Sequence, residues 1–250
     1  MSTFDPLEVT HGRLVDTTPA LWPDNTVQIC GRFVLLRDLR ETDMPALWRH
    51  LDIATNANLL DYLPWPLPPS AADFWQLLER VRVDQNWVFY AVCAHPDHLN
   101  EELQEDGERH REPMGIIAYL NISLANRELE IGSVIFSKAL QRTIAATETI
   151  YLMLMNAFQQ APFGPAYRRV SWKCHSLNEP SRRAAERIGF KYEGTFRNHI
   201  ISQGRNRDTA WFSIIEEEWL LVDAAIRRWM EDENFDQDKK QIRKLEDFRV

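Results

Sequence analysis

The chain has 250 residues, of which 44% are hydrophobic, and a formal net charge of -8. This length suits one large domain or two small ones, and the apolar content suffices for a packed core. The negative charge argues against a nucleic-acid-binding protein, which usually presents a basic face. It is compatible with a cationic substrate such as an amine.

Cys30, Cys93 and Cys174 lie in or beside apolar runs, and their odd number favours buried free thiols in a reducing compartment. The sequence contains no CxxC or HExxH pattern, so we predict no metal site. It also shows neither a secretory signal pattern nor an apolar run long enough for a membrane span. We therefore expect a soluble cytoplasmic protein without membrane contact.

The first third of the chain predicts an arm, a strand and two helices. Residues 1–25 are mixed in character and contain prolines, which favours an extended N-terminal arm. Residues 33–39 predict a strand, and a helix capped by Thr42 or Asp43 follows and ends near residue 51. A second helix, capped by Ser70, reaches about residue 83.

Between these two helices lies DYLPWPLPP at residues 61–69, a stiff loop because proline removes backbone donors. The loop carries Tyr62 and Trp65. These two aromatic side chains either line an acceptor-substrate cleft or anchor the loop in the core.

The middle of the chain predicts three strands at residues 87–94, 114–123 and 128–136. Residues 95–113 are rich in Asp, Glu, His and Arg, which favours an acidic insertion within a hairpin. The elements expected after residue 136 are a buried helix at 147–158, a strand at 169–174, a helix at 178–188, strands at 192–201 and 209–215, a helix at 218–230, and a charged tail at 231–250 that is a solvated helix or disordered.

The most informative segment runs from residue 172 to 207. Asn178 and Pro180 are typical of a helix start, and Gly189 is typical of a helix end. Asn178, Ser181, Gly189 and Phe190 match the pattern N-x-x-S-x7-G-F. Glu193-Gly194 and Phe196-Arg197 follow it. This segment resembles the C-terminal half of the Gcn5-related N-acetyltransferases (GNAT superfamily).

The order of predicted elements over about residues 25–220 also resembles that family. The phrases LQRTIAATE and GRNRDTAWFS look closest to the branch with ribosomal-protein N-terminal acetyltransferases (RimJ/RimL type). The resemblance implies an α/β, GNAT-like acyl-CoA N-acyltransferase fold. Its single mixed, mostly antiparallel sheet is splayed in the middle, with helices on both faces. The domain then spans residues 26–220, and residues 221–250 form a C-terminal helix and tail.

The resemblance implies acetyl-CoA as cosubstrate, and a helix N-terminus suits its phosphates because it presents unpaired N–H groups. Gln141 opens the matching loop, Ile144 falls where the family has its first glycine, and Arg142 is placed to pair with a phosphate. The alternative is an ordinary strand–helix connection capped by Thr143 or Thr147. The cofactor contacts implied are Val134, Ile135 and Phe136 through main chain, then Gln141, Arg142, Thr143, Ile144, Ala145, Ala146, Thr147, Asn178 and Ser181.

Two residues are candidates for proton transfer. Glu130 lies where the family often carries an acid near the incoming amine, and a carboxylate can remove the ammonium proton. The alternative is a solvated strand carboxylate. Ser181 lies where relatives place a hydroxyl near the cofactor sulfur, although both it and Asn178 also suit helix capping; Tyr192 is an alternative donor.

Cys174 precedes His175, and such neighbours on a strand point in opposite directions, so we expect direct attack by the amine and no covalent enzyme intermediate. Arg207–Asp208 predicts a local ion pair or a turn fixture.

The function that follows is transfer of acetyl from acetyl-CoA to a primary amine, either a protein N-terminus or a small molecule. A longer acyl group, a hydroxyl acceptor, or a non-catalytic CoA-binding role suggested by Ile144 remain alternatives. We expect a monomer or homodimer that binds no nucleic acid.

Overall fold

The computed structural model describes residues 13–51, 53, 56–95, 112–159, 165–237 and 240–249. Its strands are β1 (Ile29–Cys30), β2 (Val34–Asp38), β3 (Val88–Ala94), β4 (Gly115–Ser123), β5 (Glu128–Phe136), β6 (Arg169–His175), β7 (Lys191–Ser202) and β8 (Arg205–Ile215). Its α-helices are α1 (Met44–Leu51), α2 (Ala71–Gln85), α3 (Ile144–Phe158), α4 (Glu179–Ile188) and α5 (Glu216–Trp229).

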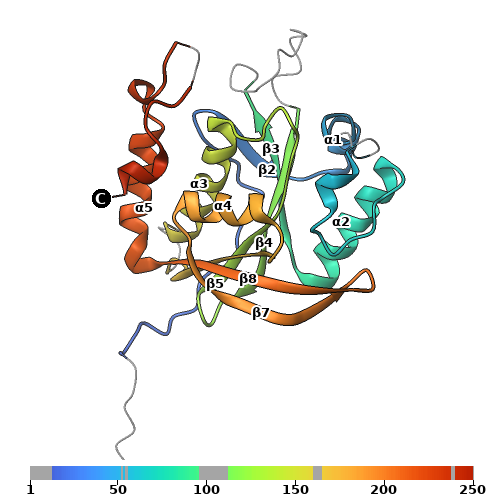
Figure 1. The fold of residues 1–250 in the computed structure, drawn as a ribbon. Coiled ribbons are helices and arrows are strands. Elements are labelled where there is room, and N and C mark those ends of the chain that lie inside the picture. Colours follow the sequence, from blue (N-terminus) through green and yellow to red (C-terminus); the bar gives the residue numbers. More distant parts are fainter. Residues whose placement is uncertain are drawn as a thin grey trace, which may run out of the picture.

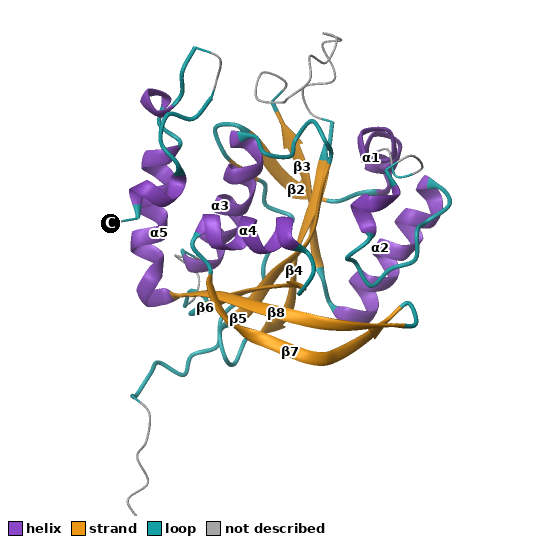
Figure 2. Cartoon of the chain, in the orientation of Figure 1, coloured by secondary structure: helices purple, strands orange, loops and turns teal. Residues whose placement is uncertain are grey.

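The strands form one mixed sheet in the order β1-β2-β3-β4-β5-β6-β8-β7. Only the β5–β6 pair is parallel; the other neighbouring strands are antiparallel. Helices α1 and α2 cover one face of the sheet, and α3, α4 and α5 lie on the other (Figures 1 and 2). The predicted fold class, with its mixed sheet and helices on both faces, is confirmed.

Each face of the sheet has its own apolar core. On β4, Ile116 and Ala118 pack with the α1/α2 side, whereas Ile117 and Tyr119 pack with the α3–α5 side. This alternation follows from the two-residue period of a strand. Helix α3 is buried nearly all round because it lies between the sheet and α5.

Capping residues define the helix ends. The Ser70 hydroxyl accepts the N–H of Asp73, and the Asn178 side chain accepts the N–H of Ser181, as expected of N-caps. Gly189 ends α4 with a φ of 124°, a conformation that glycine adopts readily. The sequence located these ends because capping chemistry is local.

Three expectations need correction. The buried helix begins at Ile144 and not at Thr147, because Thr143 provides the cap by accepting the Ala146 N–H at 3.1 Å. Cys30 is exposed, although all three cysteines are free as predicted. The C-terminal tail is neither a solvated helix nor disordered where it is described: it forms two 3₁₀ turns, with Leu245 fully buried.

The structure describes only parts of the predicted N-terminal arm and of the predicted acidic insertion. Residues 13–25 carry no regular secondary structure, but the arm is attached to the body where the Ala20 N–H donates to the Leu124 carbonyl at 3.0 Å. Residues 1–12 and most of the predicted acidic insertion, 96–111, lie outside the described residues. The insertion therefore stays a prediction.

A buried carboxylate on α3 fixes the turn between β1 and β2. Glu148 accepts the backbone N–H groups of Arg32, Phe33 and Val34 at 2.7, 2.6 and 2.9 Å. Burial raises the pKa of Glu148, and the three donors oppose that shift. A Cβ at Gly31 would lie 2.5 Å from this carboxyl group, so the close approach requires glycine.

We expect Glu148→Gln to lower the free energy of unfolding by about 2 kcal/mol, because the amide turns N–H groups toward buried N–H donors. The melting temperature should fall by about 6 °C for a chain of this size. Glu233→Gln, at an exposed carboxylate, is the control and should leave the melting temperature unchanged. Equal melting temperatures for both variants would contradict this account of Glu148.

Candidate functional site

The sheet parts where β5 meets β6. These strands pair at only three positions, Glu128–Glu130 against Arg169–Ser171. Beyond them, β5 stays paired with β4 as far as Phe136, and β6 stays paired with β8 as far as His175. The two strands therefore diverge, which is the splay that the family resemblance implied.

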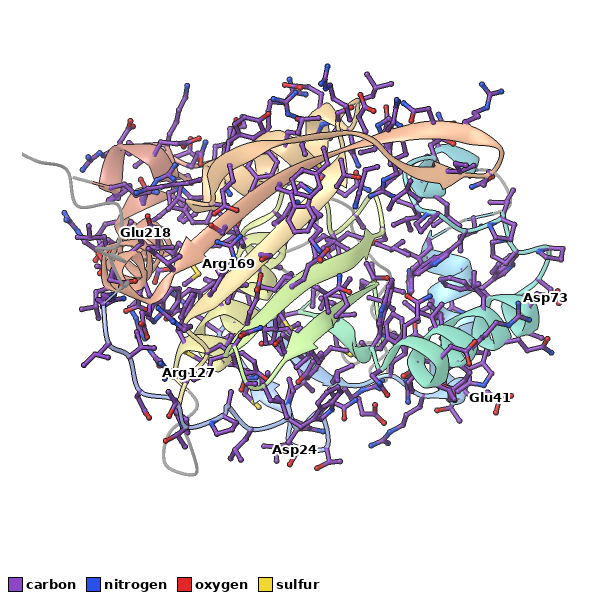
Figure 3. The ribbon with its side chains drawn as sticks, turned by 90° about the horizontal axis from the view of Figure 1, so that it is seen from below. Asp24, Glu41, Asp73, Arg127, Arg169 and Glu218 are labelled. Carbon is purple, nitrogen blue, oxygen red and sulfur yellow. The ribbon has the colours of Figure 1, made fainter. Side chains whose placement is uncertain are left out.

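The joined end of the two strands is fixed by Arg169. Its Nε donates to Glu128 on β5 at 3.0 Å, and its Nη1 donates to Glu193 on β7 at 2.7 Å. Arg169 thus links three strands, and it holds the pKa of Glu193 below the usual range. Figure 3 views this end of the sheet from below and labels Arg169 among the strands.

A cleft of about 1410 Å³ lies in the region where the strands have parted. It runs from the Pro-rich segment, across the open strand edges, to the N-termini of α3 and α4 and on to the C-terminal segment. Lining residues from the two parted strands are Gly132, Ser133, Val134 and Phe136 on β5 and Trp172, Lys173 and Cys174 on β6.

A β-bulge shapes the β5 side of the cleft. Ile116 and Ala118 of β4 pair with Ile135 and Gly132, so β5 carries one extra residue, and Ser133 has a φ of 51°. The Ser133 hydroxyl is buried and has no hydrogen-bond partner among the described residues. An unsatisfied polar atom at a cleft wall is a natural contact for a polar ligand.

The connection from β5 to α3 lies beside this wall. The Gln141 side chain donates to the Phe136 carbonyl at 2.8 Å and folds the connection back on the strand. The left-handed position is Arg142, with a φ of 62°, and Ile144 is the first residue of the helix. Ile144 therefore imposes no backbone strain, which removes the sequence-based reason to expect a weakened anion site.

The N-terminus of α3 opens on the cleft. Ile144, Ala146 and Thr147 line it, whereas Ala145 is fully buried. Helix geometry leaves the first N–H groups without intrahelical acceptors, and Thr143 satisfies the N–H of Ala146. The remaining groups can hold an anion. An open strand edge, an unsatisfied hydroxyl and a helix N-terminus in one cleft together fit an elongated, phosphate-bearing cofactor.

The start of α4 supplies the opposite wall. Asn178 and Ser181 both line the cleft, and the Ser181 hydroxyl accepts the indole N–H of Trp172 at 3.0 Å. That bond uses the hydroxyl oxygen as an acceptor, and the hydroxyl proton is left to a second partner. Burial raises the pKa of the neighbouring Cys174 thiol, and a hydrogen bond with the Ser181 hydroxyl opposes the rise.

Glu130 is a buried carboxylate, not a solvated one. Its Oε2 accepts from Lys173 Nζ at 2.8 Å and from Asn121 Nδ2 at 2.7 Å. Lys173 Nζ also lies 3.9 Å from the centre of the Trp211 ring. Burial raises the pKa of Glu130, while the charge and hydrogen bond of Lys173 oppose the rise. Lys173 lines the cleft, whereas Glu130 lies behind the wall, two residues from Gly132.

The two aromatic residues of the Pro-rich segment have different surroundings. Tyr62 lines the cleft and packs edge-on against His175. Trp65 is 6% exposed and packs against Trp87, so it anchors the segment in the α1/α2 core. The segment is also held by the tip of the β7–β8 hairpin, which reaches toward the α1/α2 side (Figure 1), where Gln203 donates to the Trp65 carbonyl at 2.7 Å.

The sequence did not indicate a role for Ser133 or Lys173. It also suggested that Arg207 pairs with Asp208. Asp208 instead accepts the Asn198 N–H at 2.7 Å and so fixes the β7 bulge, whereas Arg207 lines the cleft. Asp208 thus fixes a strand bulge and not a turn, and no ion pair joins Arg207 to Asp208 among the described residues. Period-two alternation along β8 was the available signal, because it sends adjacent side chains to opposite faces.

Among the described residues, no group of three His, Cys, Asp or Glu side chains is placed to hold a metal ion. No helix in the same part of the chain has the length and apolar character needed to cross a bilayer.

Comparison with known proteins agrees with this geometry. The model of the acetyltransferase (GNAT) domain family matches residues 34–191, more than half of the chain. The chain belongs to the GNAT acetyltransferase family. A GCN5-related N-acetyltransferase from Brucella melitensis has a similar structure, with 33% identity, a TM-score of 0.80, and coverage of 93% of this chain and 97% of that one.

Two further relatives of this GNAT protein are informative. A probable GNAT-family acetyltransferase from Chromobacterium violaceum is 31% identical, with a TM-score of 0.71 and coverage of 86% of this chain and 98% of that one. A putative ribosomal N-acetyltransferase of Bacillus subtilis, YdaF, is 30% identical over 105 residues, which is 42% of this chain. The matched segment spans only 55% of YdaF.

The buried Glu130–Lys173 pair gives a stability prediction. Lys173→Met should lower the free energy of unfolding at pH 7 by about 2–3 kcal/mol, because it leaves a buried carboxylate without its cation. The double variant Glu130→Gln/Lys173→Met should recover much of the lost free energy of unfolding, because glutamine carries no buried charge. Denaturant unfolding measures both values.

The control is Lys191→Met, which breaks the more exposed Lys191–Glu218 pair and should cost less than about 0.5 kcal/mol. If the effects of the two single substitutions at residues 130 and 173 simply add, then the two side chains are not energetically coupled.

Proposed function

We propose that this GNAT protein transfers acetyl from acetyl-CoA to a primary amine by direct attack within a ternary complex. The observation that carries the proposal is one continuous cleft joining three parts: the parted edges of β5 and β6, the N-terminus of α3, and Tyr62 of the Pro-rich segment. The cofactor would enter from the α3 side and the amine from the Tyr62 side.

The pantetheine arm would lie along β5, bonded to main-chain groups of Val134, Ile135 and Phe136. The bulge supports this placement, because Ser133 and Val134 have no register partner on β4 and both line the cleft, where the Ser133 hydroxyl is unsatisfied. Asn178 would contact the same arm from α4. Acetyl-CoA supplies the acetyl group as an activated thioester, so the main contribution of the chain is positioning.

The pyrophosphate would rest on the loop and first turn of α3, at Gln141–Thr147. The helix N-terminus favours negative charge there, and Arg142 adds an exposed cation at the mouth of the cleft. Because Ile144 opens the helix without strain, its presence gives no support to a non-catalytic role.

Glu130 would receive the proton of the incoming ammonium, through water because it lies behind the cleft wall. Burial raises the pKa of Glu130 and so makes it a stronger base than an exposed glutamate, while Lys173 and Asn121 favour its charged form. Ser181 would donate to the departing sulfur. Tyr192 is less suited to that role, because it is half-exposed and its hydroxyl bonds to Thr195 at 2.8 Å.

Turnover is the direct test of this function. We expect the purified protein to release free thiol from acetyl-CoA when a panel of amines and peptides is supplied, and calorimetry to detect CoA binding. Binding of CoA without thiol release on a broad panel would instead favour the non-catalytic alternative. If calorimetry detects no CoA binding, the proposed function is wrong.

Glu130→Gln should lower kcat/KM by about 10²-fold at low pH, where little free amine exists and a base is most needed. The deficit should shrink as the pH rises, because the amine then loses its proton without help. Glu233→Gln is the control: it removes an exposed carboxylate that does not line the cleft, and it should leave kcat/KM and its pH profile unchanged. A pH profile of Glu130→Gln parallel to that of the native protein would rule out Glu130 as the base.

A further inference from the structure

Arg207 lies on β8 at the Tyr62 end of the cleft and is half-buried. Within the described residues its guanidinium has no carboxylate partner. Its Nη1 donates to the Tyr62 carbonyl at 3.3 Å, and its buried Nε has no hydrogen-bond acceptor. The Nε–Nη2 edge, the side of the guanidinium that suits a carboxylate, is therefore unused.

The nearby carboxylates are held by other groups. Glu130 is close enough to favour the charged form of Arg207, but it is bound by Lys173 and Asn121. Asp208 is bound by the Asn198 N–H and the Asn206 side chain, the latter at 3.0 Å. The fold thus leaves one cation in this part of the cleft without a matching anion.

Such an arrangement is unfavourable for the protein alone. Burial lowers the pKa of Arg207, because desolvation disfavours the charged form. A buried donor without an acceptor loses its hydrogen bonds to water and gains none in return. An incoming carboxylate would remove both penalties at once, since it matches the guanidinium edge with two parallel hydrogen bonds.

The place of Arg207 along the cleft indicates which ligand it would meet. It shares the cleft wall with Tyr62, Lys173 and Cys174, beyond the point where β5 and β6 part. The helix N-terminus suited to phosphates lies at the other end, at Ile144. Arg207 therefore lies beside Tyr62, at the end of the cleft proposed for the amine and away from the end proposed for the nucleotide.

Tethering of the Pro-rich segment does not account for a guanidinium at this position. The 3.3 Å bond to the Tyr62 carbonyl is long, whereas Gln203 from the same hairpin holds the Trp65 carbonyl at 2.7 Å. An uncharged side chain thus already performs the tethering.

We propose that Arg207 binds a carboxylate of the acceptor, so that the substrate is an amine that also carries a carboxylate. This inference rests on the proposed function and narrows its substrate class. Two sources share that chemistry: a free amino acid, and a peptide with an acidic residue next to its N-terminal amine. In either case the carboxylate bound at Arg207 would hold the amine toward the thioester.

The test uses matched acceptors that differ only in the carboxylate: an amino acid and its decarboxylated amine, and a peptide beginning Ser-Asp and its Ser-Asn counterpart. We expect the native protein to prefer the carboxylated member of at least one pair, and that pair identifies the source. Arg207→Gln should lower kcat/KM for that member by about 10- to 100-fold, mainly through KM. Its carboxylate-free partner should change less than about threefold, and Arg207→Lys should fall between the two.

Gln203→Ala is the control, because it removes the other tether of the Pro-rich segment without touching the cation. It should leave the preference for the carboxylated acceptor unchanged. The proposal would be overturned if Arg207→Gln lowered kcat/KM equally for both members of a pair. It would also be overturned if the native protein showed no preference for the carboxylated acceptor.

Failure of the proposed function has a different signature, namely no thiol release from any acceptor. In that case calorimetry with the carboxylated acceptors alone decides the role of Arg207. If the native protein binds a carboxylated acceptor and Arg207→Gln does not, the proposed role of Arg207 is supported. If neither protein binds it, or if both bind it equally well, that role is refuted.

Discussion

The pairing of β5 with β6 over only three residues is the constraint on which the site depends. Arg169 holds that short pairing closed by bonding Glu128 on one side and Glu193 on the other. Each strand is then fixed along its outer edge by its antiparallel neighbour, so the inner edges must separate. The cleft follows from this geometry and needs no special loop to open it.

Two local irregularities convert the opening into a binding surface. The bulge at Ser133 turns β5 and places a hydroxyl without a partner at the wall. The Thr143 cap sets the start of α3 so that its first turn faces the same space. The bulge disrupts the strand ladder, and the first turn of α3 presents N–H groups without intrahelical acceptors, so a bound cofactor would supply hydrogen-bond partners at both places.

Charge inside the site is arranged in two ways. Glu130 and Lys173 neutralise each other, and the ring of Trp211 supports the cation. Arg207 has no such partner in the described part of the chain, so this end of the cleft carries excess positive charge although the whole chain is acidic. The sign of the net charge therefore says little about the ligand that a particular cleft prefers.

Most elements could be predicted from the sequence because their signals are local. Asn178 and Gly189 mark both ends of α4, and the turn at Gln203-Gly204 separates β7 from β8. The C-terminal tail was misjudged because its alternating charges conceal Asn234, whose buried side chain bonds to the Trp229 and Arg243 carbonyls. The start of α3 was misplaced because two threonines were equally plausible caps.

The sequence by itself determined the order of strands and helices, the family, and the loop and helix that line the cleft beside β5. Capping, proline and alternation act over a few neighbouring residues, so they can be recognised in one dimension. Only the tertiary structure decided that Glu130 is buried against Lys173, that Glu148 holds the turn before β2, and that Arg207 faces the cleft. Those outcomes depend on strand register and bulges between segments far apart in the chain, which no short pattern encodes.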